Sequence, residues 1–219
     1  MDGYCERLGP GLWAEPLNAV SNAAFLIACA VLLVRTRQRT LPVILGVVGL
    51  CSLSFHTFAN GFTAALDTLS ILVFVLVAVV LLARWGLRVP ANRAWLAAPA
   101  FVVFAAFVDV LLGLAGRQYT LGGYLPALLG LAGFAVALRS RPLGLAAAVF
   151  AVSLTLRTLD EPLCGSIPAG LHWAWHCLNA VVLYLVSVSV SLYQSTNFDG
   201  RSAPRHRSVR SGHKCRGHD

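Results

Sequence analysis

The stretch AGLHWAWHCLNAVVLY, residues 169–184, places His172 and His176 four positions apart in an apolar run. In an α-helix, positions i and i+4 share one face, one turn apart. Two imidazoles at this spacing can bind one metal ion. A single histidine on an apolar helix is more often a hydrogen-bonded core residue. The rest of the chain has to distinguish a metal site from a polar contact between helices.

The composition indicates an integral membrane protein. Of the 219 residues, 58% are hydrophobic and only 12% are charged, whereas soluble domains carry about 25% charged residues. The net charge of +8 does not indicate nucleic-acid binding, because six of the 17 basic residues lie in residues 201–219 and most others lie in short loops. This distribution is typical of membrane topology.

Seven apolar segments predict an all-α membrane protein, a bundle of seven transmembrane helices. Each segment approaches the ~20 residues that a bilayer core needs, and their continuous hydrophobicity argues against extended β-structure. We expect an extracytoplasmic segment at 1–16, the seven-helix domain at 17–195 and a disordered basic cytoplasmic tail at 196–219. The segments, of which the sixth is the shortest, are 17–34, 41–58, 64–83, 94–115, 121–138, 143–158 and 169–193.

The basic residues predict the orientation. In a seven-span topology, 14 of the 17 fall on one side and only Arg7, Arg117 and Arg157 fall on the other. The positive-inside rule then places the N-terminus outside and the C-terminus inside. Six or eight spans would mix the two groups, so the asymmetry also supports the count.

Polar residues within the spans suggest a functional site, because such groups are costly in a bilayer. At 1.5 Å per residue, His56 lies roughly 7 Å below the outer edge of the membrane core. Asp67 and His172 lie at about 5 Å and His176 at about 10 Å. Ser52 precedes His56 by one turn. All five residues are therefore expected in the outer third of the membrane, in one site.

Three histidines with an open fourth position are typical of catalytic zinc, which lowers the pKa of bound water to about 7. In such a site Asp67 is a candidate general base, and Ser52 is a candidate hydrogen-bond donor to a developing oxyanion. The alternative is a polar network that only joins helices.

The outer edge carries further polar features. Cys5 and Cys164 both fall on the extracytoplasmic side, where they either form a disulfide or remain free thiols. Glu6 and Glu15 bracket a Gly/Pro segment, and they either bind a hard cation such as Ca²⁺ or are solvated acids. Arg157 and Asp160, three residues apart, predict an ion pair at a helix end. Asn18 and Asn22, four residues apart, predict hydrogen bonds to neighbouring helices or loops.

Four blocks of sequence in this order resemble the alkaline ceramidase family. That family belongs to a superfamily of seven-span hydrolases that includes the progestin and adiponectin receptors. The resemblance covers residues 4–193, and its first block points to the ceramidase branch. The short loops, rich in Ala, Leu, Arg and Gly, are typical of a bacterial member. The blocks are YCE with WAEPLNAVSN (4–6 and 13–22), SLSFH (52–56), ALD (65–67), and LDEPLC with HWAWH (159–164 and 172–176).

The resemblance implies roles for individual residues. It implies zinc on the three histidines, catalytic Ser52 and Asp67, and a disulfide between Cys5 and Cys164. Animal members also bind calcium near the N-terminus, with residues that correspond to Tyr4, Glu6 and Glu15 here. Two further calcium ligands are missing, because Gly3 and Leu8 occupy their positions.

We therefore expect a zinc-dependent amidase in a bacterial inner membrane, with its site toward the extracytoplasmic side. The resemblance implies ceramide as the substrate, which hydrolysis converts into sphingosine and a fatty acid. One alternative is the same chemistry on another lipid amide or ester. The other is a non-catalytic lipid receptor or sensor that contains zinc. No nucleic-acid partner is expected.

Overall fold

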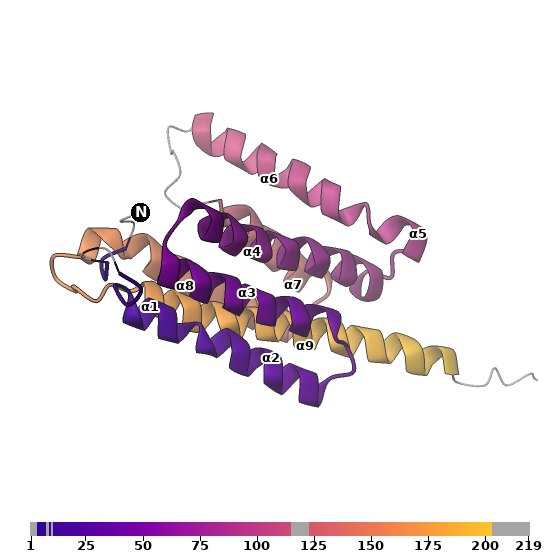
Figure 1. The fold of residues 1–219 in the computed structure, drawn as a ribbon. Coiled ribbons are helices and arrows are strands. Elements are labelled where there is room, and N and C mark those ends of the chain that lie inside the picture. The colour runs from indigo at the N-terminus through magenta and orange to yellow at the C-terminus, as the bar shows by residue number, and fades with distance from the viewer. Residues whose placement is uncertain (1–3, 8, 10, 115–122, 203–219) are drawn as a thin grey trace, which may run out of the picture.

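The computed structural model describes residues 4–7, 9, 11–114 and 123–202. Every regular element in these ranges is helical, and none of them is a strand, as the continuous apolar runs predict. Figure 1 shows the long helices packed lengthwise against one another. In chain order the elements are α1 (Pro16–Ser21), α2 (Ala23–Arg35), α3 (Thr40–Phe58), α4 (Gly61–Leu81), η1 (Leu82–Gly86), α5 (Ala91–Ala94), α6 (Ala97–Leu114), α7 (Leu125–Ala137), α8 (Arg141–Leu159), η2 (Glu161–Leu163) and α9 (His172–Ser202).

Six helical segments of the described chain are long and apolar enough to cross a membrane, as in a multi-pass integral membrane protein. They are Pro16–Arg35, Thr40–Phe58, Gly61–Gly86, Ala91–Leu114, Arg141–Leu159 and His172–Asn197.

The fifth expected span corresponds to α7, which has only 13 residues. It is thus shorter than the sixth span, α8, which has 19 residues and which we had expected to be the shortest. A 13-residue helix is about 20 Å long, less than the thickness of a bilayer core. Pro126 is the second residue of α7, and Arg139, two residues beyond its end, has a positive φ of 48°.

The outward-facing side chains are as apolar as the core. Val34, Leu114 and Val136 are exposed by 86%, 82% and 79%, which is typical of a lipid-facing surface and not of a soluble one. The centre of the bundle is filled by leucines of α2, α3 and α8 that have no exposed surface: Leu32, Leu41, Leu45 and Leu143. Helix α6 lies on the outside of the bundle (Figure 1) and packs against α4 and α7.

Two tight connections bring the polar residues to one end of the bundle. Helix α3 ends at Ala59, which has the left-handed conformation (φ 47°) that terminates many helices. Asn60 then caps α4, where its side chain and that of Thr63 form a reciprocal capping box. The last turn of α3 and the first turns of α4 therefore meet, and His56 and Asp67 lie at the same end.

The first predicted span is interrupted. Asn22 separates α1 from α2, and its amide donates to the carbonyl oxygen of Asn18 over 2.7 Å. The hydroxyl of Ser21 donates to the same carbonyl over 2.9 Å. Side chains that compete for backbone acceptors in this way favour helix ends and bends. We had expected both asparagines to contact neighbouring helices or loops. Asn18 does so, since its amide donates to Glu15 in the loop before α1, whereas Asn22, among the described residues, bonds only within its own turn.

Helix α9 is longer than its predicted span. It continues to Ser202, and residues 196–202 are therefore helical, although we had assigned them to a disordered tail. Residues 203–219, which hold the rest of that predicted tail, lie outside the described part of the chain, as do Gly3, Leu8 and Arg117.

A disulfide between Cys5 and Cys164 joins the N-terminal segment to the loop before α9. Asp160 completes this junction, since its carboxylate accepts from the backbone N–H groups of Leu171 and His172 over 2.5 and 3.0 Å. Gly170, at φ +66°, fits because an added Cβ would collide with the Asp160 carboxylate and lie 3.0 Å from the Cys5 Cβ. Two chain segments 159 residues apart are thereby held at the start of α9.

We predict that Cys5→Ser lowers stability only under oxidising conditions. Removal of a native disulfide costs about 2–5 kcal/mol, which should appear as a lower midpoint in a thermal melt of the purified protein in detergent. With reductant, the variant and the parent protein should melt together. Cys29→Ser is the control, because Cys29 is a free thiol. Identical melting curves under oxidising conditions would contradict a stabilising disulfide.

Candidate metal centre

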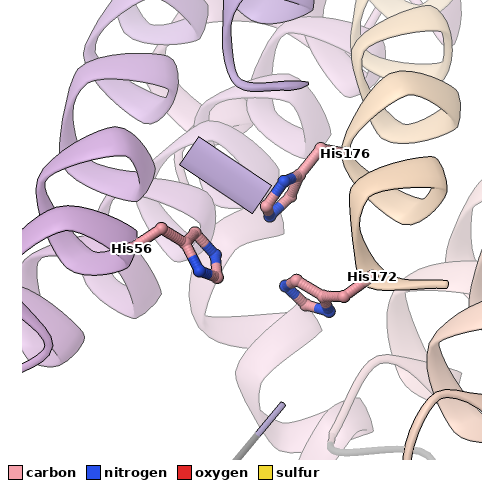
Figure 2. A group of neighbouring side chains, drawn as sticks. All are labelled: His56, His172 and His176. Atoms are coloured by element: carbon pink, nitrogen blue, oxygen red, sulfur yellow. The ribbon is translucent and has the colours of Figure 1, made fainter. Parts of the chain in front are cut away.

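The rings of His56, His172 and His176 converge between α3 and α9 (Figure 2). One ring nitrogen from each lies within 4.8 Å of the others. The three residues are exposed by only 1%, 4% and 2%. The histidines that the sequence placed at a similar depth thus form one buried cluster.

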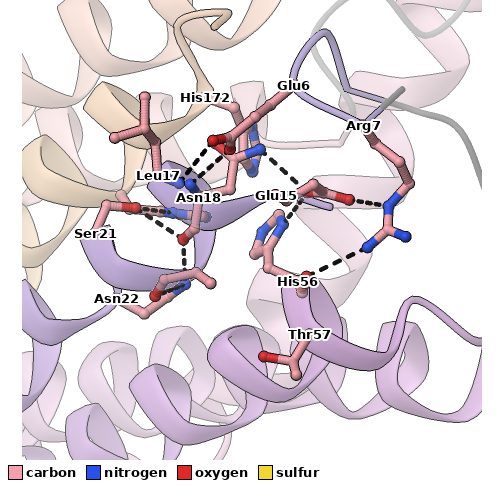
Figure 3. A network of polar contacts seen from close by, with 12 residues as sticks. Glu6, Arg7, Glu15, Leu17, Asn18, Ser21, Asn22, His56, Thr57 and His172 are labelled. Atoms are coloured by element: carbon pink, nitrogen blue, oxygen red, sulfur yellow. Dashed lines mark hydrogen bonds and ion pairs between the residues drawn. The ribbon is translucent and has the colours of Figure 1, made fainter. Parts of the chain in front are cut away.

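Glu15 orients the His56 ring. Its Oε2 atom lies 2.5 Å from His56 Nδ1, and its other oxygen accepts from Arg7 Nε. Figure 3 shows these contacts together with a third, from the Asn18 amide at 3.1 Å. Burial raises the pKa of Glu15, but the hydrogen bonds from His56 and Arg7 outweigh it and hold that pKa below its usual range. The charged carboxylate requires a proton on Nδ1 and leaves the lone pair of His56 on Nε2.

Ser21 orients the His176 ring in a similar way. Its Oγ lies 2.7 Å from His176 Nδ1, while its single proton is donated to the Asn18 carbonyl. With that proton on the Asn18 carbonyl, the serine oxygen accepts from His176 Nδ1, because a hydroxyl has only one proton. The lone pair of His176 is then on Nε2, and the break between α1 and α2 brings Ser21 to this position.

His172 is positioned by its backbone and by Tyr4. Its N–H donates to Asp160, as described above, and its ring centre lies 4.0 Å from that of Tyr4. Tyr4 is held beside the cluster through its neighbour Cys5. Burial raises the pKa of the Tyr4 phenol, so this side chain is neutral and can donate a hydrogen bond.

The cluster has the properties of a metal site. His56 Nε2 and His172 Nδ1 are buried without a hydrogen-bond partner in the described structure, an arrangement that is unfavourable unless a ligand satisfies the nitrogen. Carboxylate and hydroxyl groups behind two of the rings are typical of the second coordination shell of metal-bound histidines. Imidazole ligands suit zinc, copper, iron or nickel. The residues therefore fit a metal ion, whose identity the donors alone do not specify.

The two predicted catalytic residues lie at the same place. Ser52 and Asp67 line a small cavity of about 30 Å³ together with Tyr4, His172 and His176. Ser52 is almost fully buried. The Oδ1 atom of Asp67 is buried without a partner in the described chain, so this oxygen is free to accept a proton or a hydrogen bond.

An apolar cavity of about 80 Å³ adjoins this pocket. Four residues line both spaces: Ile71, Tyr124, Asn179 and Leu183. From there the apolar cavity extends between α4, α7, α8 and α9, past Phe74, Phe134 and Val186. A long hydrocarbon chain suits such a lining, with its polar end at the histidines.

The predicted calcium residues have other partners. Both oxygens of Glu6 accept backbone N–H groups at the start of α1, from Leu17 and Asn18, over 2.7 and 2.9 Å. Glu6 thus stabilises a helix N-terminus, where N–H groups lack helical partners. Glu15 is committed to Arg7 and His56, and Tyr4 packs on His172. These contacts explain the three residues without calcium.

The predicted ion pair between Arg157 and Asp160 is wrong. The Arg157 guanidinium lies 5.0 Å from the Tyr124 ring centre and 5.6 Å from that of Trp175. Asp160 instead accepts backbone N–H groups. Spacing along a helix suggested the pair, but Asp160 lies at the helix end, where the chain turns toward the loop before α9.

Sequence reasoning did not identify Ser21 and Asp160 as site residues, and it assigned Glu15 to a different role. Glu15 and Ser21 belong to the block WAEPLNAVSN, and Asp160 belongs to LDEPLC. These blocks carried the resemblance to a family, which was the only available signal. The positioning role appears only when the N-terminal segment is seen against α3 and α9 (Figure 3).

Comparison with protein-family models, with curated proteins and with solved structures gives no match for this chain. The resemblance to alkaline ceramidases therefore stays a prediction. The candidate site stands on the geometry of its own residues.

We predict that Ser21→Ala weakens metal binding, because the His176 ring loses the hydroxyl that orients it. Loss of such a partner typically lowers metal affinity about 10–100-fold. Competition between the purified protein and a chromogenic zinc chelator would measure the change. Ser54→Ala is a matched control, since the Ser54 hydroxyl is bonded within its own helix, to Leu50. Equal affinities of Ser21→Ala and the parent protein would refute the orienting role.

Proposed function

We propose that this chain is a zinc-dependent hydrolase of lipid amides that acts within the membrane. The observation that carries the proposal is a pocket in which His172 and His176, two of the three clustered histidines, meet Asp67 and Ser52. The adjoining apolar cavity supports a lipid substrate. Ceramide is the substrate that the resemblance implies. The basic residues of the loops favour an orientation with the N-terminus and the site on the extracytoplasmic side.

The three histidines would hold the metal through the nitrogens that lack protein partners. Zinc bound by three imidazoles polarises a carbonyl group and lowers the pKa of water to about 7. Glu15 and Ser21 keep a proton on Nδ1 of their histidines, so each ring presents a lone pair toward the centre. Burial of the cluster excludes bulk water, which strengthens the electrostatic interactions in the pocket.

Asp67 and Ser52 would perform the proton transfers and stabilise charge. The free carboxylate oxygen of Asp67 accepts a proton from the attacking water and passes it to the amine nitrogen as the C–N bond breaks. The Ser52 hydroxyl donates to the carbonyl oxygen as negative charge develops on it. The acyl chain occupies the apolar cavity, and the substrate enters sideways from the bilayer.

Asn179 would hold the amide group at the junction of the two cavities. It follows His172 and His176 on the same face of α9, at spacings of four and three residues. Its Oδ1 atom is buried without a partner in the described chain, and the residue lines both spaces. This oxygen can accept a hydrogen bond from the substrate N–H.

A metal-dependence assay tests the proposal. The purified protein in detergent is incubated with a medium-chain ceramide and with a simple N-acyl amide, and fatty acid release is measured. We expect release that disappears after treatment with a chelator, returns with zinc and is absent in His176→Ala. No release from either amide by a protein that holds one zinc ion would overturn the amidase proposal. Stoichiometric lipid binding without turnover would favour a receptor.

We predict that Asp67→Asn lowers kcat about 10²–10⁴-fold, the usual contribution of a general base, with zinc content unchanged. Asp109→Asn is the control, because Asp109 lies in α6 and lines neither cavity. Hydrolysis rates and metal analysis on the same samples would measure both effects. Retained activity in the folded, zinc-loaded variant would show that Asp67 is not the base.

A further inference from the structure

Arg157 is a cation in the metal pocket that the proposed chemistry does not use. It belongs to α8 and lines the pocket beside Asp67, His172 and Asn179. Both ion pairs of the described chain involve Glu15, and the Arg157 guanidinium makes no hydrogen bond to any described residue. A guanidinium in a membrane protein whose N–H groups have no hydrogen-bond acceptor on the protein is a candidate ligand or ion site.

Two aromatic rings hold the guanidinium in place. It lies over Tyr124 and Trp175, whose rings meet edge to face with centres 5.0 Å apart. Cation–π contacts position an arginine and leave its N–H groups available. A planar guanidinium binds a carboxylate through two parallel hydrogen bonds. The arrangement is suited to an acidic group of a ligand.

The position of Arg157 along α8 indicates which part of a ligand it meets. The hydroxyl of Ser153 donates to the carbonyl oxygen of Trp175 over 3.2 Å, which aligns α8 with the antiparallel α9. Arg157, one turn beyond Ser153, therefore lies near the level of His172. Phe150, about 10 Å from Arg157 along the axis, lines the apolar cavity. The part of the apolar cavity next to Phe150 is thus separated from Arg157 along α8, and Arg157 lies on the metal-pocket side of Tyr124.

The charges of the pocket favour an anion. Among aspartate, glutamate, lysine and arginine, the lining contains Asp67 and Arg157. They balance each other, and a divalent metal ion adds only positive charge. A neutral ligand would leave this excess uncompensated, whereas a ligand with one carboxylate reduces it.

Resting on the amidase function proposed above, we propose that Arg157 binds an acidic group on the amine side of the substrate. The preferred substrates are then N-acyl amino acids, fatty amides whose amine carries a carboxylate. Water supplies the oxygen that forms the new bond to the carbonyl carbon, and the C–N bond breaks. A proton from that water reaches the nitrogen, so the products are a fatty acid and a free amino acid.

Two amides of equal chain length test the proposal. N-palmitoyl glycine and N-palmitoyl ethanolamine differ in a carboxylate in place of a hydroxymethyl group. We expect kcat/KM at least tenfold higher for the glycine amide, mainly through KM. Arg157→Gln should lower this value about 10–100-fold, the range for a charge-assisted hydrogen bond, and change the ethanolamide less than threefold. Arg157→Lys should restore part of the preference for the glycine amide. Arg93 is an exposed residue of α5, and Arg93→Gln should leave kcat/KM for both amides unchanged.

Two results would overturn the proposal. One is equal kcat/KM for the two amides with the parent protein, which does not depend on any variant being folded. The other is an equal loss for both amides in Arg157→Gln, since the residue would then act on the fold or on the reaction in general.

A binding measurement separates this inference from the amidase function. Calorimetry with the zinc-loaded Asp67→Asn variant compares N-palmitoyl glycine, N-palmitoyl ethanolamine and palmitic acid, with and without Arg157→Gln. Tightest binding of the glycine amide, lost in the double variant, supports acid recognition even if no amide is hydrolysed. If palmitic acid binds as tightly and loses as much, Arg157 binds the carboxylate of a fatty acid, and the proposal fails.

Discussion

Three imidazole rings packed together inside an apolar bundle impose the constraint on which the rest of this molecule depends. Each ring has two nitrogens, and each nitrogen needs a partner once water is excluded. The chain provides partners for the outer nitrogens of two rings, Glu15 for His56 and Ser21 for His176. The inner nitrogens have none among the described residues. This division directs the lone pairs of His56 and His176 toward the cluster, and His172 Nδ1 is also buried without a partner in the described chain, as a metal site requires.

The N-terminal segment is therefore part of the site, although it precedes the first apolar helix. Arg7 holds Glu15, Glu6 stabilises the start of α1, and the disulfide of Cys5 brings Tyr4 against His172. Asp160 fixes the first residues of α9 from the opposite side. Irregular backbone can do this only where its polar groups are satisfied by protein or water. The end of the bundle that carries the N-terminal segment meets this condition, and the metal cluster lies next to it.

The site has two chemically different parts, the polar metal pocket and the apolar cavity next to it. Asp67 and Ser52 lie near the cluster, Asn179 marks the start of the hydrocarbon space, and Arg157 lines the metal pocket. A ligand with a long chain, a reactive carbonyl and a polar head would place its chain in the apolar cavity past Asn179, its carbonyl at Asp67 and Ser52, and its head at Arg157. An amphipathic substrate thus agrees with the position of the site in the membrane, where a lipid presents its head near the surface and its chain toward the centre.

The sequence by itself determined the helical class, the positions of the long apolar segments and which three histidines cluster, with Ser52 and Asp67 in the adjoining pocket. Hydrophobic runs and helical spacing are local properties, and depth along a span follows from a fixed rise per residue. Tertiary structure decided the partners. Glu15 contacts His56, which lies 41 residues away in the sequence. Asp160 accepts a hydrogen bond from the backbone of α9 and does not pair with Arg157. No local pattern encodes such contacts, because they depend on which helices pack together and on where each buried polar atom finds its partner.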